Sequence, residues 1–533
     1  GNGNGSFSGI MTNGSSALSV TKNGTGMQTL AGGLINHKGT TTVNGGALVF
    51  SKTSALQTSI LNNASVEINA VSGDDWILVG NGLSGGGTWI KTGAGRATFS
   101  SSAITASGTF EIRAGTLRNN NNLANWSGSS ADMDISGGAI LDLYADAIYV
   151  DQLAGSGVVQ NGYGNPSGQS GSAAYFEKFV IGVANGSSTY QGVIRNNGGN
   201  NVAGAATQGG GIQLEKQGTG TITLAGANTY TGTTTVAAGT LQVNGSLSTG
   251  VLTVAAAGTV GGSGSLAGAV TNNGTLAPGS QGVGNLTINN TLTMAGGSKV
   301  AWEIADWAGS AGTGWDKLTA TALNLTATSA NRITIKPAGA ALTNYTNSSA
   351  SFVLVQTSSG IIGFSADKFT IDTSGLSGPQ GTWAVQHSGN NLVLAYTANS
   401  DTNSNGILDA WEIARFGNAN SGANSSNADP DGDGLSNLME YALDTNPLAN
   451  NANPAAIDFA TLGDGKHLRL TVVKNPAATN LTYTVETCGT LAGWSAVDTT
   501  VESSTATQLI VRDNVTQSAA PHRFIRLRVT AGP

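Results

Sequence analysis

A motif of one lysine and three glycines occurs three times in the first half of the chain, and this repetition limits the possible folds more than any other feature. Each copy begins with a lysine followed by two alternate glycines and ends at the glycine of a G-x-L element. The copies run from Lys22 to Gly46, from Lys91 to Gly115 and from Lys216 to Gly239, so their ends are 24, 24 and 23 residues apart. Repeats of about 20 to 50 residues are typical of solenoids, in which each unit stacks on its neighbours.

Between the glycines, apolar residues alternate with Thr, Ser or Asn over very short segments. The clearest apolar pairs are Ile222/Leu224, Leu241/Val243, Leu252/Val254, Leu286/Ile288 and Leu292/Met294. A period of two places each pair on one face of a strand, and Gly and Asn supply the positive-φ turns between strands. We therefore expect strands of three to five residues. Such strands cannot bury an apolar face alone, so we expect them to coil and stack into a parallel β-solenoid over residues 1–398.

Two stretches carry a resemblance to a known family. The segment LEKQGTGTITLAGANTYTGTTTVAAGTLQVNG (214–245) and the segment GTLAPGSQGVGNLTINNTLTMAGGSKVAWEI (274–304) resemble the bacterial autotransporter-associated β-strand repeats of passenger proteins. The resemblance extends over most of residues 1–400. It implies a right-handed parallel β-helix on the cell exterior, used for adhesion, surface coating or display.

The first residues, GNGNGSFSGIMTNGSSALSVTKNGTG, resemble the interior of a repeat, which predicts a processed mature form. Residues 1–20 contain no charged side chain. The open end of a solenoid is a row of unpaired backbone groups that must be capped, charged or paired. We therefore expect association through the solenoid ends into a homo-oligomer or filament.

The net charge of −7 is concentrated in one short segment. Residues 401–446 contain eight acidic residues and one basic residue, whereas residues 1–400 contain 16 acidic and 15 basic residues. Nucleic-acid binding needs a basic stripe that displaces counterions from phosphates, and the sequence has none, so no nucleic-acid partner is expected. An isolated acidic segment favours a cation site instead.

Two twelve-residue segments in the acidic region match the calcium-loop pattern D-x-[DN]-x-[DN]-G-x5-E. They are DTNSNGILDAWE, which begins at Asp401, and DPDGDGLSNLME, which begins at Asp429. The predicted ligands of the first loop are Asp401, Asn403, Asn405, the Ile407 carbonyl, Asp409 through water, and Glu412. Those of the second loop are Asp429, Asp431, Asp433, the Leu435 carbonyl, Asn437 and Glu440. We predict two Ca²⁺ sites in residues 399–450, with Gly406 and Gly434 making the sharp turns.

Each loop leads into a short helix, LDAWEIARF or LSNLMEYAL, whereas only the strand-like NNLVLAYT precedes the first loop. The pair therefore resembles dockerin or thrombospondin type 3 calcium repeats, which implies a structural role for the metal. Without metal, the eight acids would repel one another and loosen the segment. The alternative, in which the acids cap helices and solvate a linker, does not require acids at positions one, three, five and twelve.

Residues 451–533 alternate apolar and polar side chains, as in Leu468/Leu470/Val472 and Ile525/Leu527/Val529, which predicts a small antiparallel β-sandwich. Arg526 and Arg528 are expected on its solvated face. The single cysteine, Cys488, excludes an intrachain disulfide framework and is expected in the core. No apolar run approaches the roughly 18 residues of a membrane helix, so no transmembrane segment is expected.

We predict a non-enzymatic, secreted bacterial surface or extracellular fibre protein that acts as a structural scaffold or adhesin. The alternative is a glycan-binding or polysaccharide-degrading β-helix protein. Its catalytic candidates are the acids Asp132, Asp134, Asp142, Asp146 and Asp151, and its candidate sugar-stacking residues, for cell-surface glycans as partners, are Trp76, Trp89, Trp126 and Tyr190. The histidines, His37, His387, His467 and His522, fit no metal or triad spacing and are expected at surface or partly buried positions.

Overall fold

The computed structural model describes residues 2–51, 55–78, 82–100, 103–120, 125–144, 147–162, 176–196, 210–339, 342–345, 348–376, 381–419, 422–520 and 522–532. The chain forms two compact units. The first comprises residues 1–346, 351–377 and 384–395, and the second comprises residues 347–350, 378–383 and 396–533.

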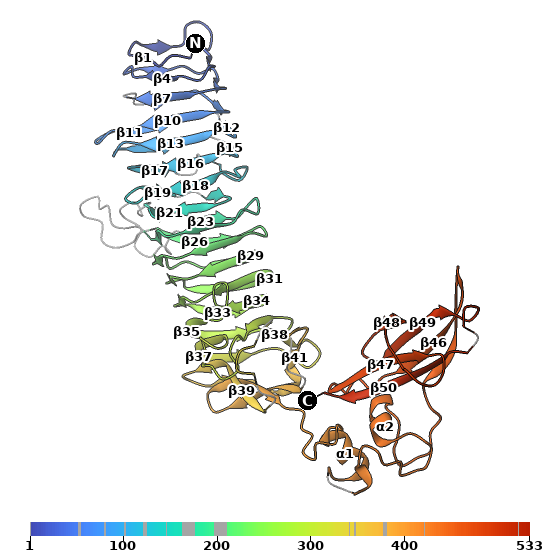
Figure 1. Ribbon diagram of the computed structural model, residues 1–533. Helices are drawn as coiled ribbons and strands as arrows, with labels where there is room; N and C mark the ends of the chain where they lie inside the picture. Colours follow the sequence, from blue (N-terminus) through green and yellow to red (C-terminus); the bar gives the residue numbers. More distant parts are fainter. Residues whose placement is uncertain are drawn as a thin grey trace. The chain divides into compact units, whose positions relative to one another are not determined.

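The first unit is a column of short strands that pair in parallel from one coil to the next (Figure 1). In its N-terminal half a coil has three strands, as in β13 (Thr88–Thr92), β14 (Arg96–Phe99) and β15 (Ile104–Ala106). β13 pairs with β16 (Thr109–Ile112) and β14 pairs with β17 (Thr116–Asn119), both in parallel. The unit is therefore mainly β with the architecture of a parallel β-solenoid, as the sequence predicted.

The remaining strands up to residue 216 also pair in parallel between coils, with β2 and β5 in a small sheet of their own. They are β1 (Gly5–Phe7), β2 (Met11–Thr12), β3 (Val20–Lys22), β4 (Met27–Leu30), β5 (Ile35–Asn36), β6 (Thr41–Val43), β7 (Ala47–Ser51), β8 (Ala55–Leu56), β9 (Ile60–Asn62), β10 (Ser65–Asn69), β11 (Asp75–Leu78), β12 (Leu83–Gly85), β18 (Asp132–Ile135), β19 (Ile140–Asp142), β20 (Ile148–Val150), β21 (Leu153–Gly155), β22 (Val158–Gln160), β23 (Phe176–Ile181), β24 (Ser188–Tyr190), β25 (Val193–Arg195) and β26 (Gly211–Lys216).

Residues 217–397 continue with longer strands. They are β27 (Thr221–Leu224), β28 (Ala227–Asn228), β29 (Thr234–Val243), β30 (Ser246–Leu247), β31 (Val251–Gly262), β32 (Ser265–Leu266), β33 (Ala269–Asn272), β34 (Thr275–Pro278), β35 (Asn285–Met294), β36 (Lys299–Glu303), β37 (Lys317–Leu325), β38 (Ile333–Gly339), β39 (Ala350–Thr357), β40 (Ile361–Ile362), β41 (Phe369–Ile371), β42 (Gly375–Leu376), β43 (Thr382–Ser388) and β44 (Asn391–Thr397), with the 3-10 helix η1 (Ala366–Lys368) before β41.

The expected strand length of three to five residues is wrong for several strands of this later part, although β27, β33, β34 and β36 have four or five residues. β29 has ten residues and β31 has twelve. β35, also of ten residues, carries two of the predicted apolar pairs, Leu286/Ile288 and Leu292/Met294. The pairing of β29 with β31 shifts register between Val236 and Ala238. A bulge of this kind bends the strand without ending it.

The alternating apolar side chains form the interior of the column. All ten residues of the apolar pairs predicted between Ile222 and Met294 are at most 1% exposed. Aromatic rings also stack inside the column, where the Trp89 and Phe110 rings lie 5.6 Å apart at an interplanar angle of 14°. Parallel stacking of coils thus provides the apolar interior that a single strand lacks.

The lysine of each repeat is buried and bound to backbone carbonyl oxygens. Lys22, Lys91 and Lys216 are 7%, 3% and 0% exposed. Each ammonium group donates three hydrogen bonds, two to carbonyls of its own turn and one to a carbonyl of the next coil. The acceptors are Asn23, Gly24 and Gly45 for Lys22; Thr92, Gly93 and Ala114 for Lys91; and Gln217, Gly218 and Ala238 for Lys216.

These contacts explain the constant spacing of the motif. The third carbonyl belongs to the residue immediately before the glycine of the G-x-L element, which is 23, 23 and 22 residues after the lysine. That glycine has a positive φ, as at Gly239 with +61°, and a Cβ there would lie 2.4 Å from the Gly218 carbonyl oxygen. Only glycine fits this turn, and the lysine holds the turn to the coil below.

The second unit contains two antiparallel sheets and two short helices. One sheet has the strand order β45 (Ala456–Leu462), β46 (Gly465–Val473), β49 (Gln508–Thr516) and β48 (Thr499–Ser504), and the other pairs β47 (Leu481–Cys488) with β50 (Phe524–Ala531). The helices are α1 (Asp409–Phe416) and α2 (Asn437–Leu443), with the 3-10 helix η2 (Gly422–Asn424) between them. The antiparallel strands predicted for residues 451–533 are therefore present.

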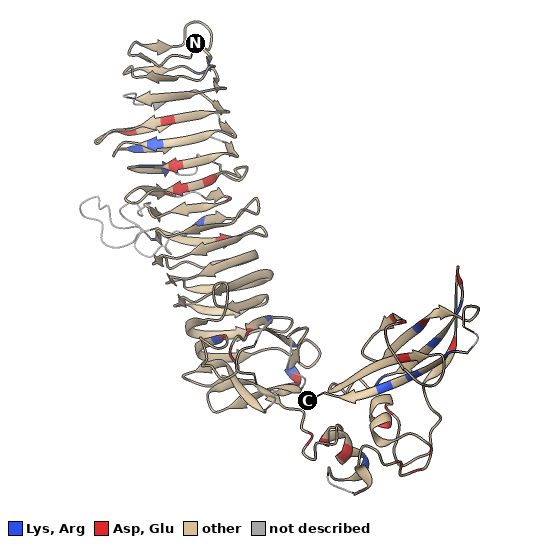
Figure 2. Ribbon diagram, in the orientation of Figure 1, with Lys and Arg blue, Asp and Glu red and all other residues tan. Residues whose placement is uncertain are grey.

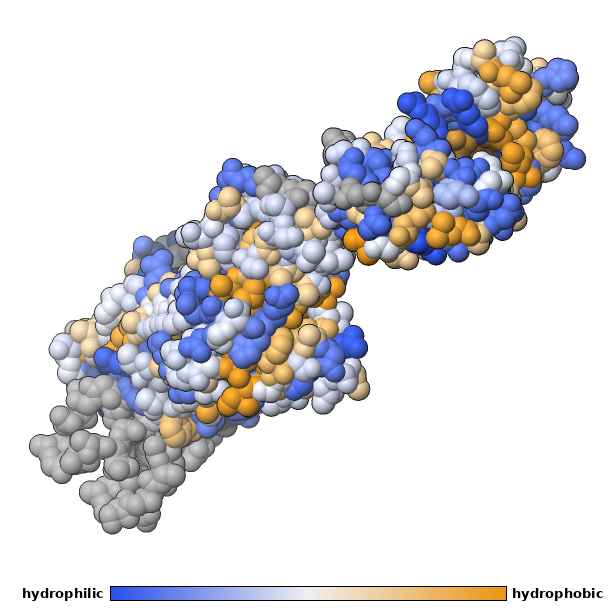
Figure 3. Space-filling model, turned by 90° about the horizontal axis from the view of Figure 1, so that it is seen from below, coloured by the Kyte–Doolittle hydropathy of each residue, from blue (hydrophilic) through white to orange (hydrophobic). Residues whose placement is uncertain are grey.

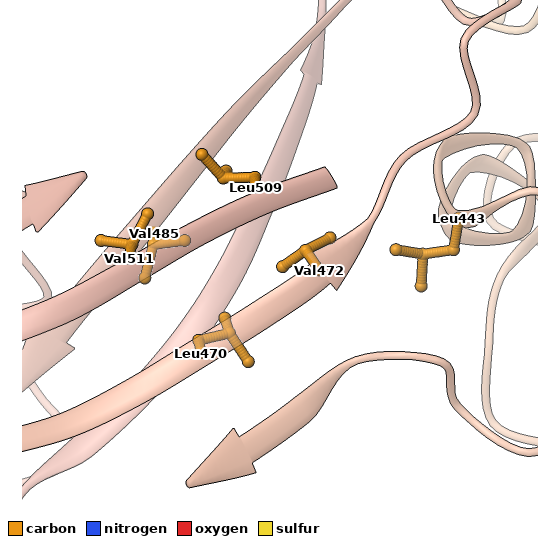
Figure 4. Packing of buried hydrophobic residues seen from close by; sticks show 6 residues of the cluster. All are labelled: Leu443, Leu470, Val472, Val485, Leu509 and Val511. Carbon is orange, nitrogen blue, oxygen red and sulfur yellow. The ribbon is translucent and has the colours of Figure 1, made fainter. Parts of the chain in front are cut away.

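The two sheets and helix α2 share one apolar core. Its buried members are Leu443, Leu470, Val472, Val485, Leu509 and Val511 (Figure 4). Leu443 ends helix α2, and its side chain lies beside the side chains of the sheets. Cys488, as predicted, is buried. Because α2 contributes to this core, the segment with the acidic loops packs directly on the sheets.

The apolar face of the four-stranded sheet extends beyond this core. Ile457 and Val501 are 60% and 58% exposed, yet their cross-strand partners Leu470 and Val511 are buried. Hydrophobic patches among hydrophilic residues are visible on the surface in Figure 3. The smaller sheet thus covers only the middle of the larger one. In the part of the chain that the structure describes, no helix is long and apolar enough to span a bilayer.

Candidate metal centre

Each acidic loop of the second unit leads directly into a helix, and Figure 2 shows the acidic residues of this region in red. β44 is the element before the first loop, and helices α1 and α2 follow the loops, as the sequence indicated. Gly406 and Gly434 have φ values of +86° and +90°, so both loops make the sharp turn predicted at position six. Helix α2 ends at Leu443, where LSNLMEYAL ends, and the next residue, Asp444, adopts a left-handed conformation with φ +58°.

In the second loop, three carboxylates converge. One oxygen atom from each of Asp429, Asp431 and Asp433 lies within 4.8 Å of the other two. Within the described ranges, no other group of three or more His, Cys, Asp or Glu side chains brings its possible ligand atoms within this distance of one another. Backbone N–H groups hold the loop in shape, since those of Gly432 and Gly434 donate to the Asp429 carboxylate at 2.9 and 3.0 Å.

Three oxygen atoms around this loop are buried and have no hydrogen-bond partner in the structure. They are Asp431 Oδ2, Asn437 Oδ1 and Glu440 Oε2. Asn437 and Glu440 are both 0% exposed. A buried oxygen without a donor costs about 1 to 3 kcal/mol, and more when it is charged. These atoms occupy positions three, nine and twelve of the predicted loop, so the donor set matches that of a calcium site.

The pKa of the Glu440 carboxyl is raised by its surroundings. Burial and the neighbouring Asp431 and Asp433 carboxylates raise its pKa to about 7. The Oε1 atom of Glu440 accepts a hydrogen bond from the Thr445 hydroxyl at 3.3 Å. A divalent cation would stabilise the ionised form of all these carboxylates together.

The first loop has the same shape but different hydrogen bonding. The side-chain amides of Asn403 and Asn405 donate to the Glu412 carboxylate at 3.1 and 2.7 Å. Glu412 is 0% exposed, and burial raises its pKa although these amides oppose the rise. The Asp401 carboxylate accepts the backbone N–H groups of Asn405 and Gly406.

Asp409, predicted to act through water at position nine, lies at the start of helix α1. Its carboxylate accepts the backbone N–H of Thr402 at 2.8 Å and also the Thr402 hydroxyl. Burial opposes ionisation of Asp409, but these hydrogen bonds outweigh it and hold its pKa below the ordinary value. The carboxylate therefore closes the loop onto the helix.

Side chains from the sheets reach the loop segment. Asn480 donates to the Gly406 carbonyl at 3.0 Å and accepts the Tyr441 hydroxyl at 2.8 Å, so one amide joins the first loop to helix α2. The carbonyl of Ala442 in the last turn of α2 accepts the Tyr483 hydroxyl and the backbone N–H of Asn475. The loops, the helices and the sheets thus form one hydrogen-bonded assembly.

The side chains of Ile407 and Leu435, whose carbonyls are the predicted ligands at position seven, are 0% and 8% exposed. Ile407 packs in a second apolar cluster with Leu408, Trp411 and Tyr441.

Sequence reasoning missed the contact between the Asn451 backbone N–H and Asp433 Oδ2, at 2.9 Å, because Asn451 lies outside the twelve-residue loop.

The acids considered for catalysis are engaged in structural contacts within the solenoid. Asp132 accepts the backbone and side-chain N–H groups of Gln152, both at 3.2 Å. Asp142 is 0% exposed and pairs with Arg118 at 2.8 Å. Asp151 accepts two backbone N–H groups from a later coil, at 2.7 and 2.9 Å. Asp134 is exposed on β18, and Asp146 lies outside the described residues.

The candidate sugar-stacking aromatics are in the core instead. Trp76, Trp89, Trp126 and Tyr190 are at most 2% exposed. Trp76, Trp89 and Tyr190 are at inward positions of β11, β13 and β24, and Trp126 packs from a loop against Phe99 and Phe110. Two histidines also differ from expectation, since His37 and His467 are both 1% exposed. Each is hydrogen-bonded, His37 to the Thr41 hydroxyl and His467 to the Asp513 carbonyl.

Arg526 and Arg528 are exposed, as expected for a solvated face, and contact Glu486 at 2.7 and 3.6 Å. The guanidinium of Arg526 also lies over the Trp494 ring at 4.3 Å. This contact ties the last strand to β47 rather than leaving its basic side chains free.

Comparison with protein families matches three segments of the chain, residues 20–50, 89–118 and 214–243, to the passenger-associated-transport-repeat. These segments coincide with the three lysine and glycine repeats and with their buried lysines. The chain therefore contains autotransporter passenger repeats in its solenoid. Comparison with curated proteins finds no match.

Proposed function

We propose that this chain is a secreted bacterial surface or extracellular scaffold, with a right-handed solenoid as its stiff part and a calcium-stabilised C-terminal unit. The observation that carries the proposal is the buried lysine of each passenger repeat, which commits its charge to carbonyls of two successive coils. Because the repeat motif uses its lysine to bind one coil to the next, it supports a structural role. Passenger repeats support export to the cell exterior, where calcium is abundant enough to fill weak sites.

A non-enzymatic role is supported by what the polar groups contact. The buried Asp142 and Asp151 carboxylates hold an arginine and backbone N–H groups, which leaves them unsuited to act as a general acid and base pair. The buried positions of the four candidate aromatics likewise remove the sugar-stacking surface on which the glycan-binding alternative depended. In this proposal, adhesion uses the Thr- and Asn-rich faces of the coils.

Calcium binding is proposed for both loops, with a structural role in the second unit. The supporting observation is the set of three buried oxygen atoms without donors around Glu440. Mass spectrometry of the purified chain under native conditions, with millimolar calcium, should show bound metal. A chain that binds no calcium under these conditions would exclude this part of the proposal.

Surface location and assembly have their own tests. Antibodies against residues 1–398 should label intact cells of the source bacterium, and cleared cytoplasm should contain little of the antigen. Association through solenoid ends should appear as concentration-dependent oligomers in sedimentation velocity and as rods of multiple lengths in negative-stain images. Label confined to the cytoplasm would exclude the surface role, and rods of one length at all concentrations would exclude end-to-end assembly.

A further inference from the structure

The two loops share one sequence pattern but differ at positions three and five. The first loop has Asn403 and Asn405 there, whereas the second has Asp431 and Asp433. An asparagine amide offers both an acceptor and two donors, whereas an ionised carboxylate can only accept. This difference decides what occupies the centre of each loop.

In the first loop, amide donors take the place of a cation. The Asn403 Nδ2 atom donates to the Glu412 carboxylate and to the Ala419 carbonyl, at 3.1 and 2.6 Å. The Asn405 Nδ2 atom donates to Glu412 and to the Asn424 carbonyl, at 2.7 and 3.0 Å. Each nitrogen therefore lies between oxygen atoms of the kinds that calcium binds, namely carboxylates and backbone carbonyls.

In the second loop, the corresponding oxygen atoms have no donor between them. Asp431 Oδ2, Asn437 Oδ1 and Glu440 Oε2 have no partner, and the Asn437 amide nitrogen instead donates away to the carbonyls of Ala423 and Ser425, both at 2.8 Å. Glu440 and Asn437 are fully buried, so water does not readily replace the missing donor. Negative charge is also greater, with four carboxylates among the predicted ligands.

We propose that the loops bind calcium in a fixed order, the second loop first and the first loop only at higher calcium concentration. Binding to the first loop requires the amides of Asn403 and Asn405 to turn, so that their oxygen atoms face Glu412. That turn breaks hydrogen bonds to a buried carboxylate and releases the Ala419 and Asn424 carbonyls as further ligands. The second loop needs no such rearrangement. The inference rests on the proposed calcium function.

The size of the difference follows from two physical terms. Binding to the first loop must break hydrogen bonds to a charged group, and fewer carboxylates weaken a calcium site. Part of the lost hydrogen bonding is recovered by the ion. We expect the two dissociation constants to differ by about tenfold to hundredfold.

Calorimetric titration of the full chain with CaCl₂, after removal of metal, tests the order. The wild-type chain should show a tight phase and a weak phase, each with one ion. Glu440→Gln should remove the tight phase, and Glu412→Gln should remove the weak phase while leaving the tight one. The double change Asn403→Asp and Asn405→Asp should strengthen the weak phase at least tenfold, because the donors are replaced by acceptors.

Far-ultraviolet circular dichroism should confirm that each variant is folded, and Asp431→Asn provides a second test if Glu440→Gln does not fold. Two equal sites in the wild-type chain, or loss of the tight phase in Glu412→Gln, would overturn the proposed order while leaving the calcium function intact. A wild-type chain without any calcium binding would instead overturn the calcium function itself.

Discussion

The solenoid turns and the second acidic loop both bring several oxygen atoms together in a buried place, yet they stabilise these atoms differently. In the solenoid, the ammonium of Lys22, Lys91 or Lys216 is covalently part of the chain and donates to three carbonyls. Around Glu440, three buried oxygen atoms have no donor, and the partner proposed for them is a cation from solution. The solenoid thus carries its own cation, whereas the proposal makes the second unit depend on one from outside the chain.

The largest expected effect is on the solenoid, from replacing its internal cation. Lys216→Met should destabilise the first unit by about 3 to 5 kcal/mol, because it leaves three buried carbonyls without their charged donor. Burial lowers the pKa of Lys216, and it lowers that of the equivalent Lys91 to about 8, at which Lys91 is still mostly charged at pH 7. Thermal unfolding measures the change.

The matched control for that experiment is Lys38→Met, since Lys38 is exposed. It should change stability by less than about 0.5 kcal/mol. Equal effects of the two changes would show that the buried ammonium has no special role. Added calcium should not restore the Lys216→Met variant, because its defect lies in the solenoid.

The next largest effect concerns pH. Asp316 is 0% exposed in the solenoid, and burial raises the pKa of its carboxyl to about 7, although backbone N–H groups of Gly284 and Glu303 donate to it. Since the folded-state pKa exceeds the unfolded value, the protonated form favours folding. The stability linked to Asp316 is present at low pH and is lost as pH rises through about 7.

The free energy of unfolding of the first unit should therefore fall by about 2 kcal/mol between pH 5 and pH 8. The variant Asp316→Asn should flatten this dependence, whatever its stability at a single pH. Denaturant unfolding at several pH values gives the slope. An unchanged slope in the variant would show that another group titrates.

The smallest effect is expected at the junction of loop and sheet in the second unit. Asn480→Ala removes the hydrogen bonds to the Gly406 carbonyl and from the Tyr441 hydroxyl, and should destabilise this unit by about 1 to 2 kcal/mol. The loss should weaken calcium binding, because the first loop is no longer held to α2. Tryptophan fluorescence and calcium titration follow both properties; an unaltered calcium affinity would show that loop and sheet are not coupled.

Much of the fold follows from local pattern. The alternating pairs such as Leu252 and Val254 predicted both the strands and their buried face, because a period of two leaves no other arrangement in a stacked coil. The position of the two acidic loops was also visible, since the turn glycines Gly406 and Gly434 and the spaced acids are neighbours in sequence.

The contacts that sequence could not reveal involve backbone atoms or distant residues. The spacing of Lys22 and Gly46 was evident, but the acceptor is a carbonyl, which every residue has. Asn480 reaches Gly406 from 74 residues away, and no local pattern marks it. Trp89 and Trp126 were considered as surface platforms because residue type alone does not tell an inward position from an outward one.

Thermal unfolding of the full chain by calorimetry, with calcium and with a chelator, tests the central contrast most directly. Lys216→Met identifies the transition of the solenoid, and Val472→Ala, in the core of the sheets, identifies that of the second unit. Calcium should raise the second unit's transition by about 5 to 10 °C and leave the solenoid's transition unchanged. A calcium-dependent shift of the solenoid, or a second unit indifferent to chelation, would contradict the account.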